Sequence, residues 1–380
     1  MTEIIYNSET KEIQFSGYIS SFKFYNQLFD ALEEHYKDNG VNFVPKFSFV
    51  KVDDFEASVL PNIILVGREI KNKHNQKIEL EILNTYATRF LESTLFFANV
   101  GKQKQIGEEI IRNNLRVNEV KFVGLDIFNF DTGFLGFYGN KSQLSPLNPD
   151  HKIQIFENYS YRYYENYLDK SIPVEKLEEL LDTIRSKKYN EIEPYVYTYF
   201  HDILEYKYRD KTHVKTILTI LSEIITNSVL YSYSSCIAML QSMNGRTKIS
   251  ISDSGIGLEG SFKYKPNFDQ YVTREFSSQY KEKLRNYLLI FDALHYSKGK
   301  DRKNLYTLLK LVIEKGGKMR IHYDDVQVVF NSSRCRTCEV IPLKCAKCLL
   351  DNLSDDKLIS PVRFFNHIFK GIHIEVELDF

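Results

Sequence analysis

The sequence predicts a protein of mixed α/β and α+β class, in which an α/β domain precedes an α+β domain. Three observations support this fold class. Strand-like and helix-like patterns alternate through residues 12–98, as they do in α/β domains. From residue 174 onward, helical patterns come first and strand patterns follow. Two closely spaced cysteine pairs interrupt this second part, which indicates a small metal-binding insertion.

The length of 380 residues allows two domains, each with a sizeable core. We expect the first domain at 1–100, a linker with accessory strands at 101–173 and the second domain at 174–380. Basic and acidic residues balance at 50 each, so overall charge gives no argument for binding nucleic acid or an acidic membrane. The sequence has neither a signal peptide pattern nor an apolar run of 18 residues. A cytoplasmic protein that does not contact membranes is therefore expected.

Short alternations of apolar and polar residues indicate strands in the first domain, and apolar residues at helical spacing indicate helices between them. The expected strands are 12–19, 46–52 and 77–83. The expected helices are 21–40, the part of 58–73 that follows Pro61, and 84–101. In the linker, strands are expected at 120–128, 133–139 and 152–158, with a Pro- and Asn-containing loop at 140–151.

In the second domain, amphipathic patterns predict two helices, at 173–188 and 195–210, followed by a third helix that contains 220–235. The segment "RTKISIS" then alternates as a strand should. An irregular segment, a helix at 305–314 and three strands complete the domain, and the last strand is expected at 371–380.

The third helix carries an unusual polar stripe. Within the apolar stretch "ILSEIITNSVLYSYSS", Glu223, Asn227 and Tyr231 recur every four residues and so share one side of a helix. Buried polar groups need partners, and a bound ligand or metal is one way to provide them. The simpler alternative is that these residues are incidental.

A turn motif follows the next strand. In "KISISDSGIG", Asp253 stands at the strand end, and Gly255 and Gly257 permit a tight turn with the backbone close to a ligand. A carboxylate in such a turn suits the edge of a base or sugar. By itself the motif is also consistent with an ordinary turn.

The two motifs together resemble the GHKL superfamily of ATPases, whose Bergerat fold is a two-layer α/β sandwich and whose members include histidine kinases and anti-sigma kinases. The segment "EIITNSVLYS" resembles its N-box and "DSGIG" its next motif. The resemblance implies that Asn227 holds Mg²⁺ on the phosphates of ATP, and that Glu223 is a general base or tunes the site. It implies further that Asp253 accepts a hydrogen bond from the adenine amino group above a floor shaped by the glycines. Tyr231 stands where the family often has histidine.

The resemblance extends downstream with one departure. The layout around the helix at 305–314 and Gly316–Gly317 matches the family, but its glycine-rich turn is replaced, and only Gly299 remains nearby. Lys298, Lys300 and Arg302 are expected to supply charge to the phosphates in its place. The alternative is a solvated basic loop, and the departure argues against hydrolysis more than against binding.

The first domain resembles the STAS domain of anti-sigma-factor antagonists, in its strand followed by "DDFEASVLPNIILVGREI" and a further strand. In that family a serine at the start of the following helix is phosphorylated, and Ser58 is the matching position. A helix N-cap is the alternative role for this serine.

The cysteines form the pattern "CRTCEVIPLKCAKC", which places Cys335, Cys338, Cys345 and Cys348 as two Cys-x-x-Cys pairs. Two such turns on a hairpin offer a tetrahedral sulfur shell that suits Zn²⁺, so we expect a structural zinc knuckle at 333–350. Free thiols and an iron–sulfur cluster are the alternatives. The remaining Cys236 lies outside this spacing and is expected in the core.

These patterns predict a bacterial, regulatory ATP-binding protein with Mg²⁺ and Zn²⁺ as further cofactors. It would hydrolyse ATP slowly or use it as a conformational switch that orders residues 258–303, sensed by a protein partner or within a homodimer. The alternatives are a non-hydrolysing scaffold that binds protein or nucleic acid through the knuckle, and a protein serine kinase.

Overall fold

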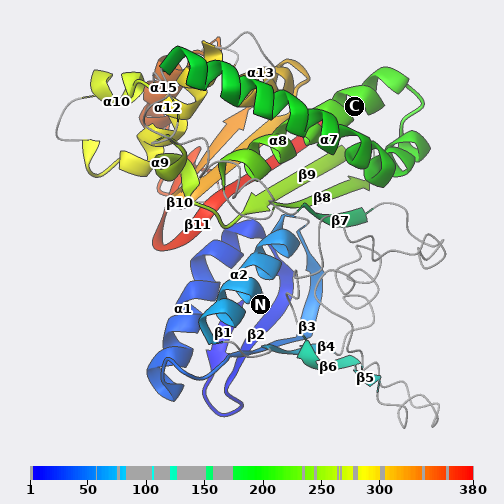
Figure 1. The fold of residues 1–380 in the computed structure, drawn as a ribbon. Coiled ribbons are helices and arrows are strands. Elements are labelled where there is room, and N and C mark those ends of the chain that lie inside the picture. The colour runs from blue at the N-terminus through cyan, green and yellow to red at the C-terminus, as the bar shows by residue number, and fades with distance from the viewer. Residues whose placement is uncertain are drawn as a thin grey trace. The chain divides into compact units, whose positions relative to one another are not determined.

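A computed structural model describes most of the chain, which divides into two compact units, Met1–Gln154 and Ile155–Phe380. The described residues are 3–56, 58–74, 78–82, 105–106, 120–125, 151–156, 174–232, 236–243, 246–262, 265, 268–276, 281–299, 304–335, 339–356 and 359–379. Each unit has its own sheet with helices packed on it, which confirms the mixed α/β class (Figure 1).

The sheet of the first unit has the strand order β1-β2-β3-β4-β6-β5. Strand β2 is antiparallel to β1 and parallel to β3, β4 is parallel to β3, and β6 is antiparallel to both β4 and β5. The bounds are β1 Ile4–Asn7, β2 Glu12–Ile19, β3 Lys46–Phe55, β4 Ile78–Ile82, β5 Gln105–Ile106 and β6 Val120–Leu125. Helices α1 (Ser21–Asn39) and α2 (Val59–His74) cover one face of this sheet (Figure 1).

Local signals explain these elements. Ser20 caps α1 by accepting a hydrogen bond from the Lys23 amide (3.4 Å), and the helix ends before Gly40. Aromatic residues fill the core between helix and sheet, with Phe15 and Phe49 in edge-to-face contact at 4.7 Å between ring centroids. The predicted strands at 12–19, 46–52 and 77–83 are present.

The start of α2 differs from the prediction, and two further predicted elements are not described. Helix α2 already begins at Val59, so Pro61 lies in its first turn, where a missing amide hydrogen costs little. Ser58 is buried, and its Oγ has no hydrogen-bond partner among the described residues, so no capping bond is seen. The helix expected at 84–101 and the strand expected at 133–139 both lie outside the described residues.

The second sheet has the order β10-β11-β9-β8-β7, and its described pairings β10–β11, β11–β9 and β9–β8 are antiparallel. The bounds are β7 His151–Phe156, β8 Cys236–Met243, β9 Arg246–Asp253, β10 Lys318–Asn331 and β11 Val362–Asp379. The accessory strands of 101–173 are thus divided between the two sheets, because β5 and β6 belong to the first and β7 to the second.

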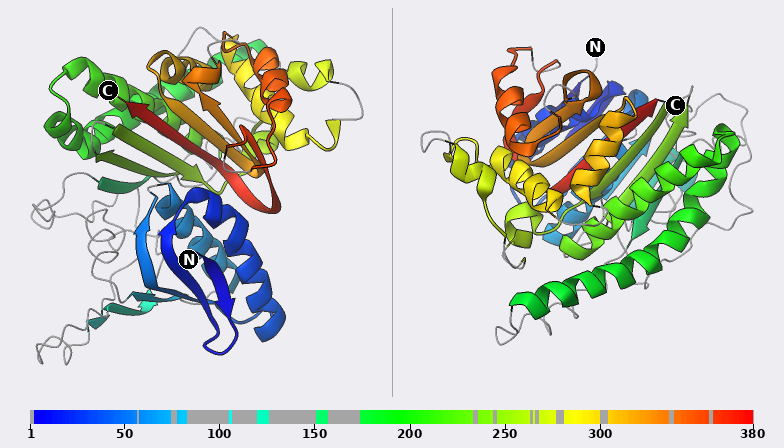
Figure 2. Two further views of the ribbon diagram at one scale, coloured as in Figure 1. Left: turned by 180° about the vertical axis from the view of Figure 1, so that it is seen from behind. Right: turned by 90° about the horizontal axis from the view of Figure 1, so that it is seen from above.

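Four helices cover one face of the second sheet (Figures 1 and 2). They are α7 (Val174–Lys207), α8 (Lys211–Tyr231), α12 (Arg285–Lys298) and α13 (Leu305–Glu314). Helix α7 runs alongside α8, and α8 packs on β8 and β9. The connections carry the short helices α9 (Gly257–Phe262), α10 (Tyr271–Glu275), α14 (Ser332–Cys335) and α15 (Pro342–Asp351).

Several predictions for this unit were wrong in detail. The segment after β9 that was expected to be irregular contains α12, because its apolar residues pack on β10, and the described residues after α13 form two long strands and not three. The helices expected at 173–188 and 195–210 are one continuous helix, α7, which contains Pro194. The intervening residues are compatible with a helix, and packing against α8 outweighs the lost hydrogen bond. Strand β8 was not predicted, because its first five residues, starting with Cys236, are all buried and show no alternation.

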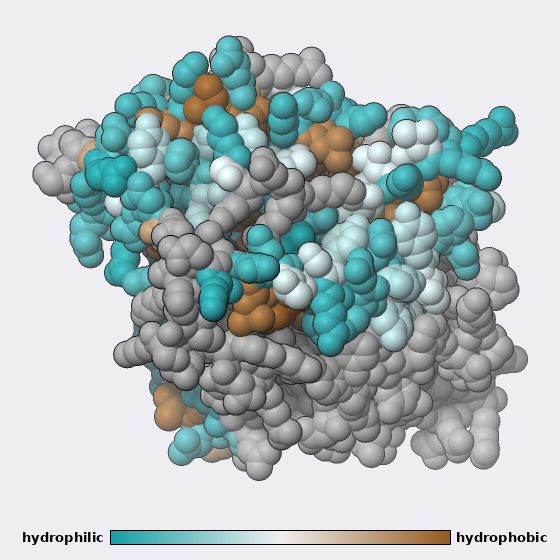
Figure 3. Space-filling view, turned by 45° about the horizontal axis from the view of Figure 1, so that its top comes forward, coloured by the Kyte–Doolittle hydropathy of each residue, from teal (hydrophilic) through white to brown (hydrophobic). Residues whose placement is uncertain are grey.

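Helix α8 is long and apolar enough to cross a membrane by composition, and it is the one such helix within the part of the chain that is described. Its apolar window is 72% buried, which is typical of the core helix of a soluble protein. On the face drawn in Figure 3, described residues are mainly hydrophilic, and hydrophobic ones form small separate groups. We conclude that α8 is the core helix of this unit.

Candidate functional site

The two sequence motifs meet where β9 ends against the C-terminus of α8. The Ile256 amide donates a hydrogen bond to the Ser232 carbonyl, with a distance of 2.8 Å. A Cβ atom on Gly255 would lie 1.9 Å from that same carbonyl oxygen, so only glycine fits. Gly257 adopts a positive φ of 67°, and a Cβ there would come within 2.7 Å of the Tyr323 ring. Both predicted glycines therefore allow the turn to contact its neighbours closely.

Asp253 is 1% exposed and holds the turn together. Its Oδ1 accepts hydrogen bonds from the amides of Gly255 (3.1 Å) and Ile372 (3.4 Å). Its Oδ2 is equally buried but has no hydrogen-bond partner within the described structure. A buried carboxylate oxygen without a partner is rare in folded proteins, and a bound ligand is one way to satisfy it.

Burial raises the pKa of Asp253 to about 7, and the amides of Gly255 and Ile372 and the Ser228 hydroxyl oppose this rise only in part. The carboxyl group therefore exchanges its proton near neutral pH. In the ionised form Oδ2 accepts a hydrogen bond from a donor, whereas in the neutral form the carboxyl group also donates one.

Asp253 lies in a pocket, here named the Asp253 pocket, formed by α8, α9, α12, β11 and the start of α13. About 780 Å³ of space lies between its walls, part of it open to solvent, and the centre of a water molecule can move through about 80 Å³ of this. Its walls are largely apolar, which suits a planar base. The lining residues include Ile224, Asn227, Ser228, Tyr231, Leu258, Ala293, Tyr296, Asn304, Leu305 and Ile374.

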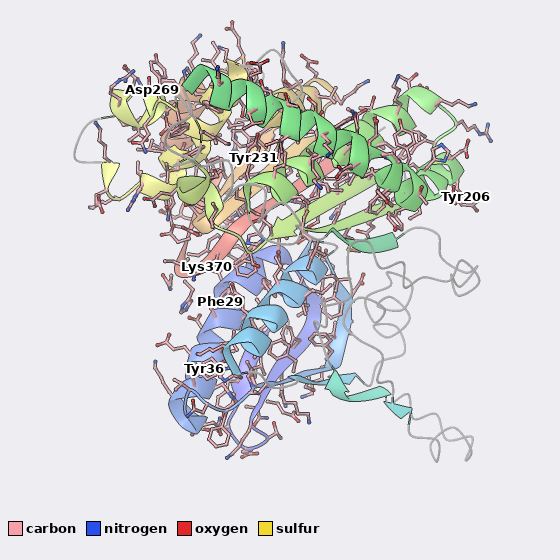
Figure 4. All side chains as sticks on the ribbon, in the orientation of Figure 1. Phe29, Tyr36, Tyr206, Tyr231, Asp269 and Lys370 are labelled. Atoms are coloured by element: carbon pink, nitrogen blue, oxygen red, sulfur yellow. The ribbon has the colours of Figure 1, made fainter. Side chains whose placement is uncertain are left out.

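Asn227 and Tyr231 are thus brought together with Asp253, as their spacing predicted. Tyr231 ends α8 (Figure 4), and burial raises the pKa of its hydroxyl to about 12. Asn227 is half-buried, one turn earlier on the same side of the helix. Its amide oxygen is a suitable ligand for Mg²⁺.

Two cationic side chains that the motifs did not predict also line the pocket. Lys265 places its Nζ 4.1 Å from the centroid of the Tyr231 ring, and the rings of Phe262 and Tyr296 are 5.3 and 5.5 Å away. Arg185 reaches the pocket from α7 and is 7% exposed. A carboxylate at one end and cations elsewhere in one pocket suit a ligand with a neutral donor group and an anionic group.

Glu223 takes a different position from the one its spacing suggested. It is not among the residues that line the Asp253 pocket; instead it lines a neighbouring depression bounded by α13. Its Oε2 pairs with Nη2 of Arg185, and both side chains are less than 10% exposed. Arg185 therefore lies between the pocket and Glu223. Positions four apart on a helix drift around its axis by about 40° per step, which contributes to this separation.

Among the basic residues expected to bind phosphates, the one that the structure describes, Lys298, does not line the pocket. Lys298 and Gly299 are exposed at the end of α12 and are not lining residues, and Lys300 and Arg302 lie outside the described residues. The ends of this segment do meet: Nδ2 of Asn304 donates to the Ser297 carbonyl at 2.7 Å. Asn304 also caps α13.

The cysteines lie in the connection between the antiparallel neighbours β10 and β11. Cys335 ends α14, and Cys345 and Cys348 share one side of α15, so the second pair lies within a helix that starts at Pro342 rather than in a hairpin turn. Cys335 and Cys345 are buried, whereas Cys338 is outside the described residues.

Neighbouring groups surround these thiols. Nδ2 of Asn352 lies 3.8 Å from the Cys348 sulfur. The Tyr287 hydroxyl donates a 2.6 Å hydrogen bond to the carbonyl of Ala346, and burial raises its pKa, with Cys345 and Cys348 raising it further. The connection is thereby fixed to α12.

Searches of the chain against family models, curated proteins and solved structures found no match. The case for function therefore depends on the site itself.

Proposed function

We propose that the Asp253 pocket binds the adenine nucleotide of Mg-ATP, in the manner of the GHKL ATPases that the motifs resemble. The observation that carries this proposal is Oδ2 of Asp253, a buried acceptor without a described partner at the bottom of an apolar pocket. An adenine amino group is a neutral donor of the right kind, and the apolar walls would cover the base. Guanine presents a carbonyl acceptor at the corresponding position, which the ionised carboxylate would reject above about pH 7.

The phosphates would then extend toward Asn227, Lys265 and Arg185. Mg²⁺ usually takes only one or two protein ligands and completes its shell with phosphate and water oxygens. The amide of Asn227, half-buried in the wall, fits this requirement as a single protein ligand. The two cations would offset the remaining negative charge of the phosphates.

We propose that the nucleotide acts mainly as a switch and is hydrolysed slowly or not at all. A general base must reach the water that attacks the terminal phosphate. Glu223 instead pairs with Arg185 and lines the neighbouring depression. The replacement of the glycine-rich turn also argues against hydrolysis. A non-hydrolysing, partner-binding role is thus the second candidate, and the Glu223–Arg185 ion pair favours it.

For the insertion we propose a structural Zn²⁺ site made by Cys335, Cys338, Cys345 and Cys348. Buried thiols and an amide N–H near one sulfur fit a thiolate-bound metal and its outer shell. With four sulfur ligands the ion would have no open position, so it would stabilise the connection and not take part in chemistry. Nucleic-acid binding by this basic segment stays an alternative from the sequence alone.

Isothermal titration of the full chain with ATP and Mg²⁺ tests the nucleotide proposal. Wild type should bind ATP and adenosine, GTP should bind far more weakly, and Asp253→Asn should lose adenosine and ATP alike. The exposed Asp269, which pairs with Arg274, provides a matched control as Asp269→Asn. A folded wild type that releases no heat with either adenine compound would refute the proposal. Phosphate release from wild type and Glu223→Ala then separates a switch from an ATPase.

A further inference from the structure

Arg185 connects the Asp253 pocket to Glu223. It belongs to α7, far in sequence from both motifs, yet its guanidinium lies in the wall of the pocket and pairs with Glu223 of α8. The side chains of Arg185 and Glu223 are 8% and 7% exposed. Removing one partner from such a buried pair leaves an uncompensated charge, so each group requires the other or a substitute.

A phosphate group is a suitable substitute for the carboxylate. The guanidinium has five N–H donors in a planar fork that binds carboxylate and phosphate oxygens in the same bidentate way. Among the described residues that line the pocket, Arg185 and Lys265 carry the positive charge. Arg185 is already paired with a carboxylate, that of Glu223.

We propose that Arg185 is a phosphate-binding residue that exchanges Glu223 for the terminal phosphate of the nucleotide and so frees Glu223. This inference rests on the proposed function of the Asp253 pocket. It adds a regulatory step, because the position of α7 and the release of the glutamate both then depend on the number of phosphates.

Glu223 has a second group from α7 nearby when Arg185 leaves. Tyr189 lies one turn further along α7, and its hydroxyl donates a 3.1 Å hydrogen bond to Oε1 of Glu193. Burial raises the pKa of Tyr189, and the charges of Glu193 and Glu223 raise it further.

The experiment compares Glu223→Gln with the double variant Glu223→Gln/Arg185→Met, neither of which contains an unpaired buried carboxylate at position 223. Ligands are adenosine and the β,γ-imido analogue of ATP with Mg²⁺, which excludes effects of hydrolysis. Loss of the competing carboxylate should tighten binding of the analogue by Glu223→Gln about tenfold relative to wild type. Adding Arg185→Met should then weaken it about 10- to 100-fold, since hydrogen bonds to charged groups are lost. Adenosine affinity should stay within about twofold throughout.

Lys188→Met is the matched control, because Lys188 lies on the same helix but pairs with Glu191 at 2.7 Å. It should leave both affinities unchanged, and circular dichroism should show every variant folded. If the two Glu223→Gln variants bound the imido analogue equally well and still bound adenosine, the role of Arg185 would be refuted and the proposed function of the pocket would stand. Failure of wild type to bind either ligand would refute the pocket's proposed function and this inference with it.

Discussion

Replacing Asp253 with asparagine changes the charge in the pocket and leaves its shape nearly intact. The asparagine oxygen can still accept the amides of Gly255 and Ile372, which lie 3.1 and 3.4 Å from Oδ1. The amide nitrogen takes the place of Oδ2, so a donor replaces the acceptor that the base would use. We therefore expect a variant that folds more stably but binds adenine poorly.

The size of the stability gain follows from the pKa of Asp253, which burial raises from 3.8 to about 7. Because the folded-state pKa is raised, the folded protein retains a proton that the unfolded chain loses. The stability of wild type therefore falls as the pH rises from 3.8 to about 7, and is constant above that range. At about 1.4 kcal/mol per pH unit, asparagine should raise the free energy of unfolding by about 4 kcal/mol at pH 8 and about 2 kcal/mol at pH 5, because it removes the cost of the buried charge.

Urea unfolding followed by far-ultraviolet circular dichroism measures this difference without requiring tryptophan, which the chain lacks. Asp253→Asn and wild type are compared at pH 8, 6.5 and 5, with exposed Asp269 changed to asparagine as the control. A variant that is less stable than wild type at pH 8, or a difference that grows as the pH falls, would contradict the assignment of a buried, strained carboxylate.

Three further changes test other parts of the structure. Burial lowers the pKa of His322 to about 3 and that of His373 well below its ordinary value. Between pH 6.5 and 5 these two imidazoles therefore take up protons in the unfolded chain but not in the folded protein. In the Asp253→Asn background, which removes the opposing contribution of that group, each histidine should lower stability by about 2 kcal/mol between pH 8 and 5 in urea unfolding. Asp324, whose pKa burial raises to about 6, offsets part of this fall. Gly255→Ala should destabilise the protein by about 3 kcal/mol in the same assay, because its Cβ would overlap the backbone at the end of α8. Cys345→Ser should lose the bound zinc in metal analysis and lower the melting temperature.

The controls for these changes are also present in the chain. Gly299→Ala should be nearly neutral, because its Cβ would lie 3.7 Å from the nearest atom. An Asp253→Asn variant as stable at pH 5 as at pH 8 would contradict the neutral state of His322 and His373. Purified wild-type protein without zinc, still folded and melting at the same temperature as Cys345→Ser, would argue against the metal site.

The sequence predicts the elements whose hydrophobic pattern is local. Strands such as β2 alternate clearly, and α13 is bounded by Asn304 and Gly316, so both could be placed closely. Strand β8 could not, since it is buried on both faces and its run of apolar residues lacks a period. The continuity of α7 through Pro194 depends on tertiary packing, which no local pattern reveals.

The same distinction applies to the candidate site. Asn227, Tyr231 and Asp253 could be proposed because helical spacing and a strand-end turn constrain them locally. Arg185 is one of many charged residues in an amphipathic pattern, and its approach to Glu223 depends on how α7 crosses α8. No sequence pattern predicted that Lys265 lines the pocket, because the rings that it contacts come from three separate helices, α8, α9 and α12.

The contact between Gly255 and Ser232 has a mechanical consequence. It joins backbone to backbone, so no change of side-chain rotamer can lengthen or shorten it. The backbones that carry Asn227 and Asp253 are therefore held together at the end of α8. Whatever moves when the pocket fills or empties must belong to the elements around that junction, which makes α7 and the helices after α9 the parts to follow with site-specific labels.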